Sequence, residues 1–180
     1  MITAEQSVLM IVDVQGKLAQ VMQQSAQLHQ KLAVLIQGAQ LFDIPIIWLE
    51  QLPDKLGPTS EEIAQLLTKT SNPIAKEHFS AWHCDEVKQQ LKGLNRNKVI
   101  LAGIETHVCV YQTCKDLLDN DYQVHLVADA VSSRGTDNKV LGVQMMLNDG
   151  AQLTNVESLL FELQHVAQGE RFKALLKLIK

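Results

Sequence analysis

The chain lacks an excess of basic residues: 16 lysines and arginines stand against 20 aspartates and glutamates, and the formal net charge is −4. Proteins that bind nucleic acid need clustered positive charge against the phosphate backbone, so we expect no nucleic-acid partner. No apolar stretch approaches the roughly 20 residues that cross a bilayer, and the start, MITAEQSVLMIVDVQG, has no basic segment typical of a signal peptide. We expect no contact with a membrane.

Cysteine is scarce. The three cysteines, Cys84, Cys109 and Cys114, are an odd number without the dense spacing of a disulfide-bonded domain. Reduced thiols in a cytoplasmic protein are the simpler interpretation.

The chain also lacks linkers, internal repeats and low-complexity tracts, so its 180 residues predict a single domain over residues 1–180. The first apolar run is followed by IVDVQGKL, which offers one glycine where a nucleotide-binding fold requires GxGxxG. We therefore expect no nucleotide and no other cofactor.

Short apolar runs alternate with longer segments of helical period. The runs occupy residues 7–13, 44–50, 72–76, 97–103, 122–129 and 151–155. This alternation predicts a parallel sheet with helical crossovers, and runs that are apolar throughout predict helices on both faces. The expected fold is a three-layer α/β/α, Rossmann-like architecture. Between the second and third runs, residues 52–67 read as a loop and then a helix capped by Thr59 or Ser60.

Polar groups stand at the carboxyl ends of three predicted strands, where open parallel sheets bind ligands. Asp13 ends the first strand, with Gln15 just beyond, Lys76 ends the third, and Cys109 follows the fourth. Each has an ordinary alternative role as a helix cap, a solvated strand end or a small buried side chain. Together, an acid, an amine and a thiol supply a base, a cation and a nucleophile for acyl transfer.

The segment GIETHVCV, residues 103–110, places the thiol where a strand gives way to a helix. Thr106 suits the N-cap position, which would put Cys109 in the first helical turn. The positive end of the helix would then lower the thiol pKa, and main-chain N–H groups, including that of Cys109, would receive an oxyanion.

These residues resemble a known family. IVDVQ, the lysine of PIAKEHFSAW and GIETHVCV are similar to motifs of the isochorismatase-like cysteine hydrolases, which include nicotinamidases, carbamoylsarcosine amidases and isochorismatases. EQLPDKLGPT and GIETHVCVYQT most resemble the isochorismatase domain-containing proteins. The resemblance covers nearly the whole chain.

The resemblance implies six strands in the order 3-2-1-4-5-6 and a catalytic triad of Asp13, Lys76 and Cys109. It also implies a non-proline cis peptide between Ile104 and Glu105, which would turn the Glu105 N–H toward the oxyanion site beside that of Cys109. Nicotinamidases carry metal-binding histidines after the second strand, whereas WLEQLPDKLG has none. We therefore expect no metal.

Four residues are candidates for substrate binding: Gln15, Gln51, Phe79 and Thr106. Phe79 would form an apolar wall beside Lys76. Glu50 and Gln51 would line the pocket or cap the loop, and these alternatives stay open.

Other polar residues have weaker signals. His78 and His83 lack a third ligand for a metal. His107, two residues from the thiol, would point away from it toward the surface or a neighbouring subunit. Cys114 is a core residue or a resolving thiol. Asp129, with residues 132–134, would organise the loop after the fifth strand.

We expect a hydrolase that cleaves a small amide or related carbonyl compound through a thioester on Cys109. The alternatives are an isochorismatase-type vinyl ether hydrolase, or a non-catalytic redox or binding protein that uses Cys109 and Cys114. The resemblance implies a homo-oligomer. The apolar C-terminal segment 172–180 would contribute to an interface or pack on the sheet.

Overall fold

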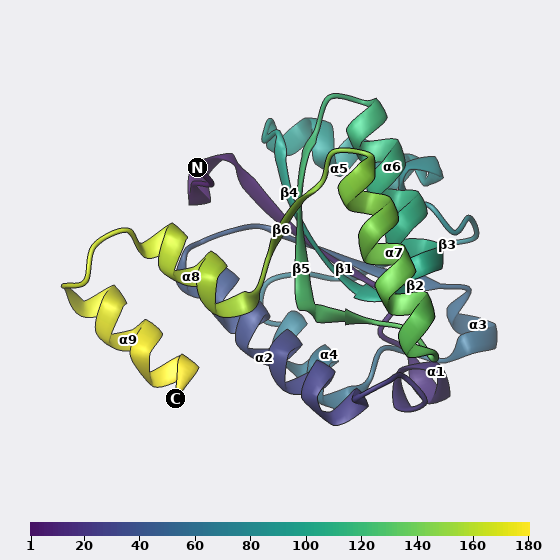
Figure 1. Cartoon of the computed structure of the whole chain (residues 1–180), viewed down its shortest axis with the longest axis horizontal. Coiled ribbons are helices and arrows are strands. Elements are labelled where there is room, and N and C mark those ends of the chain that lie inside the picture. The colour runs from purple at the N-terminus through teal and green to yellow at the C-terminus, as the bar shows by residue number, and fades with distance from the viewer.

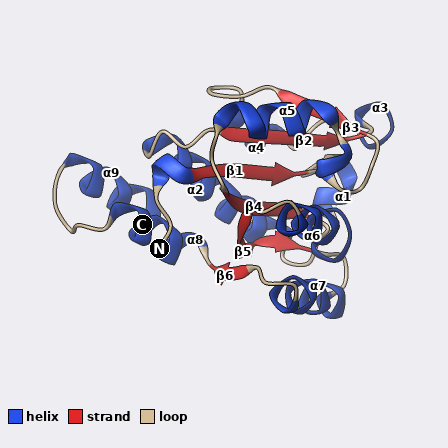
Figure 2. Cartoon of the chain, turned by 90° about the horizontal axis from the view of Figure 1, so that it is seen from above, coloured by secondary structure: helices blue, strands red, loops and turns tan.

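The computed structural model describes all residues from Met1 to Lys180, and its centre is one six-stranded sheet between two layers of helices (Figures 1 and 2). The strands are β1 (Ser7–Val12), β2 (Ile46–Gln51), β3 (Pro73–Lys76), β4 (Lys98–Ile104), β5 (Gln123–Ser132) and β6 (Gln152–Thr154). Their order is β3-β2-β1-β4-β5-β6, and every neighbouring pair is parallel. The predicted fold class and strand order are confirmed.

Helices connect the strands and cover both faces of the sheet. They are α1 (Gly16–Gln20), α2 (Ser25–Leu41), α3 (Pro53–Leu56), α4 (Glu61–Leu67), α5 (Asp85–Leu94), α6 (Tyr111–Asp119), α7 (Thr136–Asn148), α8 (Val156–Gln164) and α9 (Glu170–Ile179). Two short 3-10 helices, η1 (Ala4–Gln6) and η2 (Ala81–His83), and a π-helical turn, η3 (Thr106–Val110), complete the chain. None of the helices is both long and apolar enough to cross a membrane.

Alternation along β1 explains the two helical layers. Val8, Met10 and Val12 belong to the core beneath α5, α6 and α7, whereas Leu9 and Ile11 belong to the core beneath α2, α4, α8 and α9. Successive side chains of a strand point to opposite faces, so a central strand that is apolar throughout must be covered on both. The predicted three-layer arrangement follows from this pattern.

Strand β5 is longer than the sequence predicts. β5 continues to Ser132, three residues beyond the predicted end at 129. Its register against β4 changes along the way: Leu101 pairs with Leu126, but Gly103 pairs with Val131. Extra residues in β5 are accommodated by this bulge, a feature that apolar patterning does not reveal.

Asp129 therefore lies within β5 and not at its end. Its Oδ1 accepts a hydrogen bond from the Val156 N–H (2.9 Å), and its Oδ2 lies 3.3 Å from Lys31 Nζ. The side chain joins the strand to the start of α8 and to Lys31 of α2. Asp129 thus fixes the connection between β6 and α8, and not the loop of residues 132–134 that we expected.

The N-cap position of α4 is Ser60, one of the two predicted residues, but its hydroxyl makes no bond to an N–H of that helix. Thr59 has another role as well, because its N–H and hydroxyl both donate to Glu50 Oε1, at 2.7 and 2.8 Å. The predicted side-chain cap is thus wrong. Of the two roles left open for Glu50, the structure has the carboxylate fixing the loop before α4.

The C-terminal helix α9 packs against α2 and α8. Leu175 is its fully buried residue. Its apolar face therefore packs within this chain, but on two helices and not on the sheet, as one of the two sequence interpretations had it.

Candidate active site

Asp13 is the first residue after β1, at the sheet edge toward which the arrows of β1 and β2 point in Figure 2. Its backbone is left-handed (φ 50°) and its side chain is 2 % exposed. The neighbouring position on β4 is Gly103, with φ 120°, where a Cβ would lie 2.1 Å from the Val12 carbonyl oxygen. A glycine is needed here because β4 approaches β1 so closely. The close approach brings the end of β4 beside the carboxylate.

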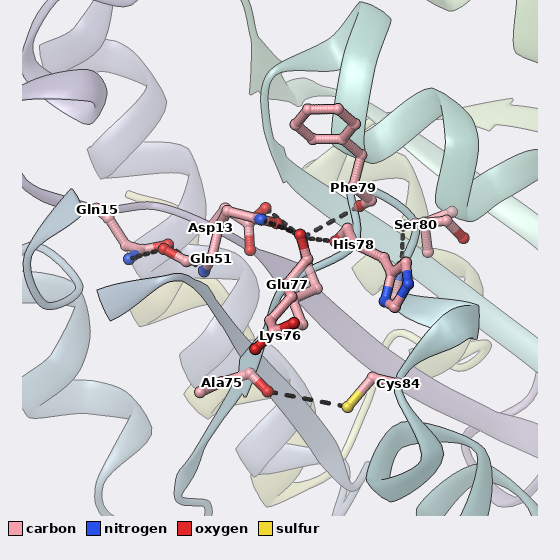
Figure 3. Close-up of polar contacts among 12 residues, drawn as sticks. Asp13, Gln15, Gln51, Ala75, Lys76, Glu77, His78, Phe79, Ser80 and Cys84 are labelled. Carbon is pink, nitrogen blue, oxygen red and sulfur yellow. Dashed lines mark hydrogen bonds and ion pairs between the residues drawn. The ribbon is translucent and has the colours of Figure 1, made fainter. Parts of the chain in front are cut away.

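Lys76 ends β3, and its ammonium is surrounded by four oxygens (Figure 3). Nζ lies 2.7 Å from Asp13 Oδ2, 2.5 Å from Gln51 Oε1, and 3.1 Å from each of the main-chain carbonyls of His78 and Phe79. An ammonium has three hydrogens and no acceptor, so all of its donors are used by the protein itself. Lys76 is therefore a fixed positive charge and has no hydrogen left for a ligand.

Cys109 lies in the π-helical turn η3 and is 8 % exposed. The cap residue of this turn is Glu105, whose carbonyl accepts from the N–H groups of Val108 (3.1 Å) and Val110 (3.2 Å). The predicted N-cap at Thr106 is therefore wrong: Thr106 is the first residue inside the turn. Its side-chain hydroxyl is fully buried and has no hydrogen-bond partner.

The thiol is not the acidic group that we predicted. Burial, and then the negative charge of Asp13, raise the pKa of Cys109 to about 12, and the nearby Lys76 ammonium only partly opposes them. Removing a charged group from water disfavours its ionised form, and here this effect exceeds the help that the helix start gives. Cys109 is consequently a neutral thiol at neutral pH.

The pKa of the neighbouring Asp13 carboxyl is shifted as well, and the Cys109 thiol contributes to that shift. Burial raises the pKa of Asp13 above its usual range, while the Lys76 ammonium and the Cys109 thiol oppose the rise. Oδ2 binds Lys76, and Oδ1 is buried with no ordinary hydrogen-bond partner. Asp13 thus has one oxygen held by a cation and one free oxygen in a site that includes the thiol. The three residues that the sequence singled out are brought together.

The peptide bond between Ile104 and Glu105 is cis, as the resemblance implied. The Glu105 side chain is 10 % exposed, and its Oε1 accepts from the main-chain N–H of Arg134 (3.0 Å) and from Arg134 Nε (3.2 Å). These bonds fix the segment between β4 and η3 to the end of β5.

Gln15 and Gln51, which we expected to bind substrate, make hydrogen bonds to other groups of the protein. The Gln15 side chain is fully buried. Its Nε2 donates to the carbonyls of Gln51 (3.1 Å) and Gly57 (2.7 Å), and its Oε1 accepts from the Gln51 N–H (2.6 Å). Gln51 in turn accepts from Lys76 and donates to the Glu77 carbonyl (2.7 Å). Both amide hydrogens of Gln15 are occupied, so it supports the Lys76 site and does not offer a donor to a ligand.

Phe79 contributes its carbonyl to Lys76, whereas its ring points away from the ammonium and is 55 % exposed (Figure 3). The predicted apolar wall beside Lys76 is therefore not formed in this chain alone. Trp82, from the same segment, packs edge-on against Tyr122 with ring centroids 5.8 Å apart, which makes it part of the helical layer.

Sequence reasoning missed the anchors of the Lys76 loop. The Ala81 N–H donates to Thr113 Oγ1 (2.9 Å), and Ser80 Oγ donates to Asp116 Oδ2 (2.6 Å). Thr113 and Asp116 stand four and seven residues after Cys109, the spacing of one helical face. The helix α6, which follows the turn that holds Cys109, thus also fixes the loop whose carbonyls hold Lys76. That spacing was a signal available in the sequence.

The remaining candidates lie outside this cluster. His78 and His83 have ring centroids 5.6 Å apart, and His83 Nε2 lies 3.2 Å from Asp116 Oδ2. No group of three or more histidine, cysteine, aspartate or glutamate side chains has the geometry to hold a metal ion. His107 Nδ1 is 3.0 Å from Ser133 Oγ, and Cys114 is a fully buried free thiol in the core.

Comparison with known proteins identifies the family of this chain. The model of the isochorismatase domain matches residues 7–158. The chain is 37 % identical to the secreted isochorismatase effector Isc1 of Phytophthora sojae (97 % of this chain, 84 % of that protein) and 34 % identical to isochorismatase domain-containing protein 2A of mouse (99 % and 85 %).

Among solved structures, MAR1 ribonuclease from Caenorhabditis elegans superposes with a TM-score of 0.92 at 36 % identity, covering 99 % of this chain and 91 % of that one. The YcaC gene product of Escherichia coli, described as an octameric hydrolase of unknown specificity, shares the fold (TM-score 0.91, 20 % identity, 98 % and 89 % covered). The chain belongs to the isochorismatase domain family.

Proposed function

We propose that this protein is a cysteine hydrolase that cleaves a small amide or a related carbonyl compound through a thioester on Cys109. Its membership of the isochorismatase family supports a hydrolase. The main support for the thioester mechanism is that the two oxygens of the Asp13 carboxylate have different surroundings. Oδ2 is bound to the buried Lys76 ammonium, and Oδ1 is buried and unpaired in the site that holds the thiol. A carboxylate held in this way is placed to act as a general base.

In the proposed reaction the proton of the Cys109 thiol moves to Asp13 Oδ1 as Sγ attacks the carbonyl carbon. The oxygen of the tetrahedral intermediate is received by the N–H groups of Glu105 and Cys109. The amine leaves with the proton from Asp13, and a thioester remains. Asp13 then takes a proton from water, which attacks the thioester and releases the acid. Asp13 returns this proton to the departing Cys109 sulfur, so the carboxylate and the thiol are both restored at the end of the cycle.

The raised pKa values of both groups fit this sequence. A Cys109 thiol with a pKa of about 12 is unreactive until a base removes its proton, and burial makes Asp13 a better base than an ordinary carboxylate. Lys76 contributes a fixed charge that offsets the negative charge shared by Asp13 and Cys109. Because its hydrogens are all used, Lys76 is not the proton donor to the leaving group.

The chain gives little support to an RNA substrate, although one solved relative is named a ribonuclease. Its formal charge is −4, and binding a phosphate backbone requires an excess of lysine and arginine. We also propose self-association, since the exposed Phe79 ring leaves room for a neighbouring subunit to cover the site. The three free cysteines support a reducing, cytoplasmic location, although one relative is a secreted effector.

The test is release of ammonia over a panel of small amides by the wild type, Cys109→Ala and Asp13→Asn. We expect turnover of at least one amide by the wild type and a loss of roughly 10³-fold or more in both variants. Activity that survives both changes would refute the proposal. Turnover of a vinyl ether that survives Cys109→Ala would favour the isochorismatase-type alternative.

A further inference from the structure

A second group of catalytic character lies away from the Cys109 site, in an open groove of about 860 Å³ between α2 and the start of α4. Four of its lining residues are Ser25, His29, Ser60 and Glu62. His29 is only 7 % exposed although it lines the groove. None of these residues has a part in the proposed hydrolysis.

The hydrogen bonds of His29 determine where its proton lies. Nδ1 is 2.7 Å from the carbonyl oxygen of Ser25, which can only accept. In the neutral ring Nδ1 therefore carries the hydrogen and Nε2 has a free lone pair. Ser60 Oγ lies 3.0 Å from Nε2, so the serine hydroxyl is the donor in this contact. This is the arrangement of a serine, a base and a group that orients the base.

The placement of Ser60 is not explained by helix capping. Ser60 occupies the N-cap position of α4, yet its hydroxyl makes no cap hydrogen bond. Instead it is directed to the imidazole. Glu62 Oε1 lies 3.8 Å from His29 Nε2, where its negative charge would stabilise the imidazolium formed when the serine gives up its proton.

We infer that Ser60 is a second nucleophile, activated by His29, that accepts acyl groups from small uncharged or cationic esters independently of Cys109. Oγ forms a bond to the acyl carbon while its proton passes to His29 Nε2. The bond from the acyl carbon to the leaving oxygen then breaks, and that oxygen takes the proton from Nε2. The product is an ester on Ser60, which water hydrolyses with His29 again as base. Glu61 and Glu62 at the groove disfavour anionic esters.

The experiment uses Cys109→Ala as the starting protein and p-nitrophenyl acetate as the probe, followed by mass spectrometry of the digested protein. We expect acetylation of Ser60 to be about 100-fold faster than that of Ser158, an exposed serine whose hydroxyl makes no hydrogen bond to the protein. Ser60→Ala should abolish this adduct. His29→Asn, which can keep a donor toward the Ser25 carbonyl but has no acceptor at the position of Nε2, should reduce it to the rate of Ser158.

Replacing the buried His29 can unfold the protein, so a third variant changes an exposed residue instead. The Glu62 side chain is 70 % exposed, so Glu62→Gln leaves the fold intact, and it should slow acetylation by roughly two- to five-fold. Equal labelling of Ser60 and Ser158, or unchanged labelling of Ser60 in a folded His29→Asn protein, would overturn the inference. Because Cys109 is absent throughout, neither result bears on the proposed thioester mechanism.

Discussion

Removal of the Lys76 charge is the most informative change to the stability of this protein. The Lys76 and Asp13 side chains are 0 % and 2 % exposed, and Nζ and Oδ2 are 2.7 Å apart. Replacing Lys76 by methionine leaves the Asp13 carboxylate buried without its partner. Breaking a buried ion pair in this way costs about 3–5 kcal/mol of unfolding free energy. A loss of this size is expected for Lys76→Met near neutral pH.

The loss should depend on pH in a definite direction. Burial already raises the pKa of Asp13, and the Lys76 ammonium opposes that rise, so its removal raises the folded-state pKa further. A raised folded-state pKa favours the protonated form, so stability is retained below the unfolded pKa of about 4 and declines as pH rises toward the folded pKa. The gap between wild type and Lys76→Met should therefore widen as pH rises above the folded-state pKa of Asp13 in the wild type, by up to about 1.4 kcal/mol per pH unit.

Urea denaturation followed by circular dichroism from pH 4.5 to 7.5 measures this gap. Adding Asp13→Asn to Lys76→Met removes the unpaired charge and should restore most of the stability and abolish the pH dependence. The control is Lys173→Met: Lys173 lies 2.7 Å from Glu170, but the side chains are 67 % and 89 % exposed, so the change should cost less than about 1 kcal/mol. A Lys76→Met penalty as small as that of the control, or one that is constant with pH, would refute the reasoning.

Three further predictions concern Cys109 and the helices around it. Alkylation of Cys109 by iodoacetamide should keep accelerating above pH 9, because its pKa is raised to about 12; a plateau near pH 7 would contradict this. Thr113→Val leaves the buried Ala81 N–H unpaired and should cost about 1–3 kcal/mol in urea denaturation and lower kcat, whereas Thr113→Ser should restore both. Gly142→Ala places a Cβ 2.8 Å from main-chain atoms of η3 and should cost about 1–3 kcal/mol, while Gly93→Ala, with open space at its Cβ, should be neutral or stabilising; α7 packs directly on η3, so equal effects of the two substitutions would contradict that packing.

The architecture was predictable because its causes are local and periodic. Buried parallel strands are apolar throughout, and each of the six runs produced a strand within two or three residues of its predicted bounds. The convergence of Asp13, Lys76 and Cys109 was predictable for a related reason: strands of a parallel sheet end at one edge, so residues far apart in the chain meet there.

The chemistry around these residues was less predictable, because it depends on burial and on side-chain geometry. The helix start suggested an acidic thiol, but desolvation and the Asp13 charge outweigh it. Gln15 was taken for a substrate ligand because it lies two residues after Asp13, yet its amide is fully used by the main chain of a loop some 40 residues away. The sequence does not show which hydrogen-bond partners a buried side-chain amide will have.

The central claim is that Cys109 carries the acyl group during turnover. The direct measurement is intact-protein mass spectrometry after rapid acid quenching of a reaction with an amide found in the ammonia-release panel. The account predicts a mass increase equal to the acyl group, located on Cys109 and removed by hydroxylamine, and no such adduct in Asp13→Asn. Steady turnover without any adduct on Cys109, or with the same adduct in the Asp13→Asn protein, would contradict it.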